Sequence, residues 1–133
     1  MHLRLEEVRW ALDQGAGEID IVITREHVMT QSWSALYDEV AAMREACGPA
    51  HLKAILATSD LGTLRDVHSA SIVAMQAGAD FIKTSTDKEG TNPTLPVGLV
   101  MVWALRDYTE ARGHRVGFKP VRAMRSAKDA IAW

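Results

Sequence analysis

The chain has 133 residues, of which 47% are hydrophobic and 24% are charged, a composition typical of one soluble globular domain. Its formal net charge of −2 gives no electrostatic reason to expect nucleic acid as a partner, and no apolar run approaches the roughly 20 residues that cross a bilayer. The single cysteine, Cys47, cannot form an internal disulfide, and the first residues lack the apolar core of a signal peptide. We therefore expect a cytoplasmic protein that binds neither nucleic acid nor a membrane.

Helical and strand periods alternate along the whole chain. Leu5, Val8 and Leu12 share one helical face, and the β-branched segment 18–23 predicts the first strand. The pattern then predicts a helix at 33–47, a strand at 52–58, a helix at 64–77, a strand at 80–86, a helix from Pro96 to Gly113, a strand at 115–120 and a final helix whose start at Ser126 and Asp129 has capping-box spacing. Four strands that are each followed by a helix predict an α/β fold with parallel strands. Because no glycine-rich nucleotide motif follows any strand, an open doubly wound sheet and part of a β/α barrel both fit this order.

Each predicted strand carries one charged residue inside an apolar run: Asp20, Lys53, Lys83 and Lys119. Side chains alternate between the two faces of a strand, and the uniformly apolar set suits a layer of helices. We therefore expect the four charged residues to point together at the centre of the sheet or barrel.

Two interpretations of this charge cluster remain open. Asp20 could form a structural ion cluster with one or more lysines, because buried charges persist mainly when they are paired or used. Alternatively, three lysines exceed one carboxylate, and two ammonium groups about 6 Å apart repel each other by about 2.8 kcal/mol at an effective dielectric near 20. Such repulsion favours loss of a proton from one lysine, which is what imine chemistry requires. The residues alone do not say which lysine this is.

Two segments carry a resemblance to a known family. Asp80-Phe81-Ile82-Lys83-Thr84-Ser85-Thr86 and Gly117-Phe118-Lys119-Pro120 resemble two signature strands of deoxyribose-phosphate aldolase, a class I (Schiff-base) aldolase family. The segments around Asp20 and Lys53 resemble the two strands before them. The resemblance implies a parallel β/α barrel of the TIM type, of which residues 1–133 would form the fourth to seventh strands. The chain would then be a single partial catalytic domain, a half-barrel of four βα units.

The resemblance also implies roles for individual residues. Lys83 would attack the aldehyde carbon to form the imine, Lys119 would help Lys83 to lose its proton, and Asp20 would shuttle protons. The implied reaction is the reversible cleavage of 2-deoxy-D-ribose 5-phosphate to glyceraldehyde 3-phosphate and acetaldehyde, with no cofactor. The implied substrate-binding residues are Lys53, Thr84, Ser85, Thr86, Lys88 and Arg122.

A metal-dependent reaction has no support in the sequence. The histidines form no ligand pair and are better interpreted as surface or packing residues: His2, His27, His51, His68 and His114. We therefore expect no metal site.

Two loops depart from the family pattern. Asp87 stands where the family has a glycine after Lys-Thr-Ser-Thr, and Val121-Arg122-Ala123 replaces Ala-Gly-Gly after Phe-Lys-Pro. Glycines in such loops let the backbone approach a phosphate, so both changes oppose that contact. Lys88 matches the family, and Arg122 could bind phosphate through its side chain or simply fill the space.

Length is the larger departure, because a complete β/α barrel has about 250 residues. A half-barrel leaves two sheet edges and an apolar face uncovered, so we expect it to pair with a second copy or with a missing barrel half. Three hypotheses follow. The chain could be an aldolase-type lyase, a non-catalytic half-barrel that oligomerises or binds a partner, or an imine-forming aldolase for an unphosphorylated aldehyde.

Overall fold

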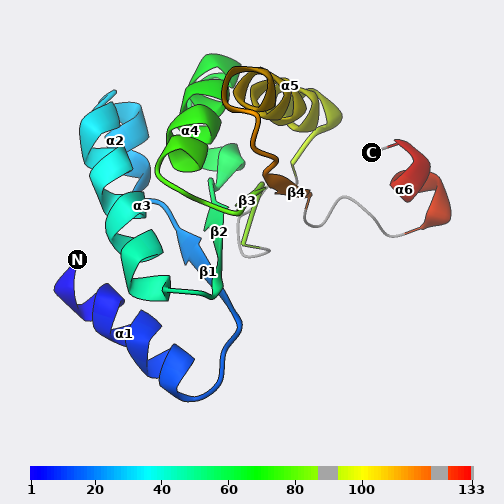
Figure 1. The fold of residues 1–133 in the computed structure, drawn as a ribbon. Helices are drawn as coiled ribbons and strands as arrows, with labels where there is room; N and C mark the ends of the chain where they lie inside the picture. Colours follow the sequence, from blue (N-terminus) through cyan, green and yellow to red (C-terminus); the bar gives the residue numbers. More distant parts are fainter. Residues whose placement is uncertain (87–92, 121–125, 133) are drawn as a thin grey trace.

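The computed structural model describes residues 1–86, 93–120 and 126–132. Its centre is a four-stranded sheet with the order β1-β2-β3-β4, in which every pairing is parallel (Figure 1). The strands are β1 (Glu18–Val22), β2 (His51–Ile55), β3 (Phe81–Lys83) and β4 (Gly117–Lys119). Because each strand returns to the same end of the sheet through a helix, neighbours in sequence are neighbours in space, as the alternating pattern predicted.

The predicted helices are all present in the described residues, with small shifts at their ends. They are α1 (His2–Asp13), α3 (Trp33–Cys47), α4 (Leu64–Gln76), α5 (Leu95–Arg112) and α6 (Ala127–Ala132). Gly113 ends α5 with a left-handed φ of 69°, and the Ser126 hydroxyl accepts the backbone N–H of Asp129 at 3.2 Å, as the capping spacing predicted. None of the helices in the described part of the chain has the length and apolar character needed to cross a bilayer.

The strands are shorter than predicted, and the structure contains two short helical elements that were not predicted. They are α2 (Arg25–Met29) and the 3-10 helix η1 (Thr58–Asp60), both too short to show a helical period. The segment 56–58 was expected to continue the second strand, but β2 ends at Ile55. The physical reason is that Ala57 adopts a left-handed φ of 52°, which turns the chain into η1.

The core lies between the sheet and the helices on one of its faces. Along β1, Ile19 and Ile21 are buried, whereas Glu18, Asp20 and Val22 are exposed. The strand residues of the buried face pack with the largest fully buried helix and loop side chains, which are Leu36, Met43, Leu56, Met75 and Met101.

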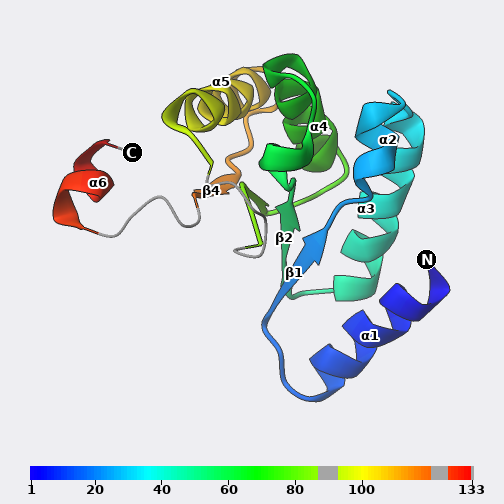
Figure 2. The ribbon, with the colours of Figure 1, turned by 180° about the vertical axis from the view of Figure 1, so that it is seen from behind.

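The helix layer follows the strand order around one side of the sheet. α1 packs on α3, α3 on α4 and α4 on α5, and Figures 1 and 2 show these helices together on that side. A doubly wound sheet carries helices on both faces, so this arrangement is that of part of a β/α barrel. The charged residues lie on the face of the sheet that a barrel turns inward.

Candidate active site

The register of the strands places the four charged residues in two adjacent layers of the inner face. Asp20 pairs with Lys53, and Lys83 pairs with Lys119. Lys83 pairs across β2 with Ile55 rather than Lys53, so Lys83 and Lys119 lie one layer nearer the carboxyl ends of the strands. The carboxyl ends are where β/α barrels carry their active sites.

Asp20 is the common partner of all three lysines. Nζ of Lys83 donates a hydrogen bond to Oδ2 of Asp20 at 2.9 Å, and Nζ of Lys119 lies 4.0 Å from the same oxygen. Nζ of Lys53 lies 3.7 Å from the other oxygen, Oδ1. Burial acts to raise the pKa of Asp20, but the hydrogen bond from Lys83 and the charges of the three lysines outweigh it and hold that pKa below its ordinary value. Asp20 is therefore an ionised carboxylate at neutral pH.

The three lysines differ in exposure. Lys53 and Lys83 are buried, whereas the side chain of Lys119 is 47% exposed. A buried ammonium group needs a partner, and the hydrogen bond from Lys83 to Asp20 supplies one. Lys119 has a longer contact with Asp20, and its side chain is open to solvent.

Glu18 is a member of the charge cluster that the sequence reasoning missed. Nζ of Lys53 donates a hydrogen bond to Oε2 of Glu18 and also lies 5.6 Å from the centre of the Phe81 ring. The hydrogen bond and the charge of Lys53 lower the pKa of Glu18. The expected count of three lysines to one carboxylate was therefore wrong, because two carboxylates face the lysines. Glu18 stands two residues before Asp20, so strand alternation could have placed it on the same face.

The hydroxyl residues after β3 lie at the carboxyl end of the sheet. Thr84 and Ser85 are buried and Thr86 is half-buried. The backbone N–H of Thr84 donates to the carbonyl of Lys119 at 3.3 Å, which ties this segment to β4. Lys88 and Arg122, together with Asp87, Val121 and Ala123, lie outside the described residues.

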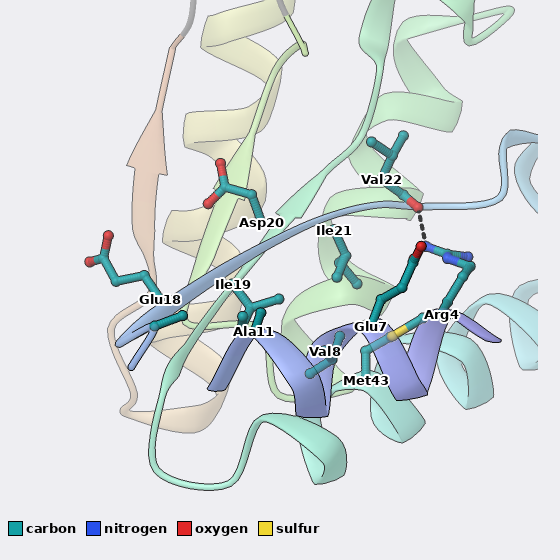
Figure 3. Close-up of a pocket in the computed structure, with 11 residues that line it drawn as sticks. Arg4, Glu7, Val8, Ala11, Glu18, Ile19, Asp20, Ile21, Val22 and Met43 are labelled. Atoms are coloured by element: carbon teal, nitrogen blue, oxygen red, sulfur yellow. Dashed lines mark hydrogen bonds between the residues drawn. The ribbon is translucent and has the colours of Figure 1, made fainter. Parts of the chain in front are cut away.

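A cavity of about 590 Å³ lies along the outer edge of β1, beside the charge cluster. Figure 3 shows Glu18 and Asp20 on one side of the strand, and Ile19 and Ile21 on the other, toward Val8 and Met43. At one end Arg4 donates a hydrogen bond of 2.6 Å to the carbonyl of Val22. The cavity therefore lies between α1 and β1, with Glu18 and Asp20 among its lining residues.

Within residues 1–86, 93–120 and 126–132, no group of three histidine, cysteine, aspartate or glutamate side chains is arranged to hold an ion. The chemical groups that the site offers are two amines near one carboxylate oxygen, a third amine and a second carboxylate. These groups can form an imine and transfer protons.

Comparisons with known proteins place this chain among aldolases. A family model described as DeoC/LacD family aldolase matches residues 2–106. The deoxyribose-phosphate aldolase of Homo sapiens is 58% identical over 130 residues, which cover 98% of this chain and 41% of that protein. That of Agrobacterium fabrum is 41% identical over 128 residues, which cover 96% of this chain and 48% of that protein.

Solved structures agree with the sequence comparison. A structure from Coccidioides immitis that carries the name deoxyribose-phosphate aldolase superposes with a TM-score of 0.86 at 25% identity, over 96% of this chain and 49% of that one. The aldolase QR15 superposes with a TM-score of 0.82 at 24% identity, over 98% of this chain and 56% of that one. The chain thus spans less than half the length of the curated relatives given above.

Proposed function

Because the chain belongs to the DeoC/LacD family of aldolases, we propose that its inner sheet face is the imine-forming site of an aldehyde-lyase. The proposed reaction is the cleavage of 2-deoxy-D-ribose 5-phosphate to glyceraldehyde 3-phosphate and acetaldehyde. One observation carries the proposal. The buried Nζ of Lys83 lies 2.9 Å from the ionised carboxylate of Asp20, and Lys119 approaches the same oxygen.

Imine formation begins with a proton transfer. Lys83 gives a proton to Oδ2 of Asp20 along their hydrogen bond, and the ammonium of Lys119 favours this loss through charge repulsion. The neutral amine adds to the aldehyde carbon of the open-chain sugar. The resulting carbinolamine loses water, and this oxygen leaves more readily after it takes a proton from Asp20 or Lys119.

Carbon–carbon cleavage follows from the charge on the imine. The hydroxyl on the third carbon loses its proton and becomes a carbonyl, while the bond between the second and third carbons breaks. Its electron pair moves into the protonated imine and gives an enamine on Lys83, and glyceraldehyde 3-phosphate leaves. Protonation of the enamine carbon and addition of water then release acetaldehyde and restore the amine.

The proposal assigns the remaining residues to substrate binding. Lys53, Thr84, Ser85 and Thr86 would contact the sugar, and Lys88 and Arg122 would reach its phosphate. In this proposal residues 1–133 act as one partial catalytic domain in the breakdown of deoxyribose phosphate and deoxyribonucleotides in the cytoplasm.

Borohydride trapping tests the proposal on the purified chain. Acetaldehyde and borohydride should leave an ethyl group on Lys83 much faster than on Lys128, an exposed lysine of α6 that serves as an internal control. The variant Lys83→Met should lose the fast-labelled peptide, and Lys128→Met should keep it. Equal labelling of Lys83 and Lys128 in the native chain would rule out an activated amine.

A second arm addresses the phosphate. Trapping with deoxyribose 5-phosphate is compared with trapping with deoxyribose at equal concentration. A clear preference for the phosphorylated sugar supports the proposed substrate. Equal rates would favour an aldolase for unphosphorylated aldehydes, which the loop changes at Asp87 and Arg122 would permit.

The edges of the sheet support a further part of the proposal, namely that the site is completed by another half-barrel. Among the described residues no strand pairs with the outer edge of β1, and a cavity lies between this strand and α1. α5 also exposes Leu95, Leu99 and Trp103, which follow one another at four-residue spacing. We propose that a second copy or a missing barrel half covers these surfaces. Sedimentation of the purified chain should show association, and a strictly monomeric chain would rule out the second copy.

A further inference from the structure

The side chain of Lys53, on β2, lies near two carboxylates that both belong to β1. Its Nζ donates a hydrogen bond to Oε2 of Glu18 and lies 3.7 Å from Oδ1 of Asp20. The side chain of Lys53 is only 9% exposed, whereas that of Glu18 is 57% exposed. The ammonium group is therefore shared unequally, with the hydrogen bond going to the more solvent-exposed carboxylate.

The carboxylate of Asp20 is close to lysines from three other strands. Lys83 on β3 donates a hydrogen bond to Oδ2, Lys119 on β4 approaches the same oxygen, and Lys53 on β2 is level with Asp20 in the register. Nζ of Lys53 lies 3.7 Å from Oδ1 of Asp20, so a movement of about 1 Å would bring it to hydrogen-bond distance. In the structure the hydrogen bond of Lys53 goes to Glu18 instead.

We propose that Glu18 is a positioning residue of the site, which holds the ammonium of Lys53 and thereby keeps Asp20 available to Lys83 and Lys119. The catalytic consequence rests on the function proposed above, whereas the electrostatic effect on Asp20 does not. Without Glu18, three ammonium groups would share one carboxylate. Asp20 would then bind a proton less readily and would accept one from Lys83 more slowly.

Two physical effects of removing Glu18 act in the same direction. Lys53 would move toward Asp20 and stabilise its ionised form. The negative charge of Glu18, which now opposes ionisation of its neighbour, would also be absent. The charged groups that face Asp20 in the described part of the chain are Glu18 and the three lysines, so both effects can be followed at one carboxyl.

The test is to titrate Asp20 by carbon-13 NMR in the native chain and in Glu18→Gln. We expect the pKa of Asp20 to fall further in the variant. Glu7→Gln is the matched control, because this substitution also removes one negative charge. Glu7 lies on α1 and lines the same cavity as Glu18. This control should leave the titration of Asp20 nearly unchanged.

A double variant separates positioning from simple charge removal. In the background Lys53→Met there is no ammonium to release, so adding Glu18→Gln should change the Asp20 titration less than it does in the native chain. In the trapping assay Glu18→Gln should slow labelling of Lys83 about 3- to 10-fold at neutral pH, a coupling typical of neighbouring groups. In a plot of the Lys83 labelling rate against pH, the fall on the acid side should move to lower pH in Glu18→Gln, together with the titration of Asp20.

The outcomes are distinguishable from those of the aldolase proposal. An unchanged Asp20 titration in Glu18→Gln, or an equal shift with and without Lys53, would overturn the positioning role even if trapping occurs. An Asp20 shift in a chain that forms no adduct at Lys83 would support the positioning role and reject the aldolase function. Because Glu18 is mostly exposed, the variant should fold, and circular dichroism checks this.

Discussion

Replacing Asp20 by asparagine should destabilise the fold at neutral pH, because it removes the carboxylate that three lysines share. Lys83 and Lys53 are 8% and 7% exposed, whereas the side chain of Asp20 is 34% exposed. Removing one partner of a buried ion pair costs about 3–5 kcal/mol, and exposed pairs contribute only about 0.2–1 kcal/mol. Asp20 lies between these limits, so we expect the free energy of unfolding to fall by about 1–3 kcal/mol.

The destabilisation should depend on pH with a definite sign. The pKa of Asp20 lies below its ordinary 3.8 in the folded chain, so the unfolded chain takes up a proton there at higher pH than the folded chain does. The stabilisation from Asp20 is therefore complete above about pH 5 and is lost as the pH falls through the folded pKa. The variant lacks this contribution at every pH, so the gap between the two proteins should close on acidification.

Urea unfolding of the two proteins, from neutral pH down to about pH 3, measures this gap. Asp13→Asn is a suitable control, because Asp13 is exposed at the carboxyl end of α1, where a negative charge is slightly unfavourable. It should leave stability unchanged or raise it slightly. A variant at position 20 as stable as the native chain at pH 7, or a gap that stays constant toward pH 3, would refute the reasoning.

Three further substitutions probe the scaffold of the site. Leu36→Ala removes a fully buried side chain from the helix layer and should lower the free energy of unfolding by about 2–5 kcal/mol in urea, whereas a smaller loss would mean that the layer repacks. Gly117→Ala places a Cβ where it would overlap the Phe81 ring. It should therefore lower the free energy of unfolding by about 1–3 kcal/mol in the same assay and slow the trapping of Lys83. A variant as stable as the native chain would show that the ring moves freely. Thr63→Ala removes the side chain that accepts the N–H of Asp66 at the start of α4 and should cost about 1 kcal/mol by thermal unfolding, with Thr63→Ser close to the native value.

The strand faces were predictable because alternation is a local property of the chain. Alternation along the first strand assigns Ile19 and Ile21 to one face and Asp20 to the other. The structure confirms this assignment. Gly117 and Phe81 show where this reasoning stops. Their pairing across β3 and β4 depends on two segments far apart in the sequence, and only the register reveals that the ring covers the glycine.

The sequence by itself determined the order of the four strands and of the helices α1, α3, α4, α5 and α6, the parallel sheet and the face that carries Asp20 and the lysines, because hydrophobic periods and chain connectivity encode these directly. Only the tertiary structure decided which carboxylate each lysine reaches. A lysine side chain can extend over several ångströms, so its partner need not be the residue level with it in the register. In the folded chain Lys53 is level with Asp20 but donates its hydrogen bond to Glu18, whereas Asp20 accepts from Lys83 and lies near Lys119, a distribution of charge that no local pattern contains.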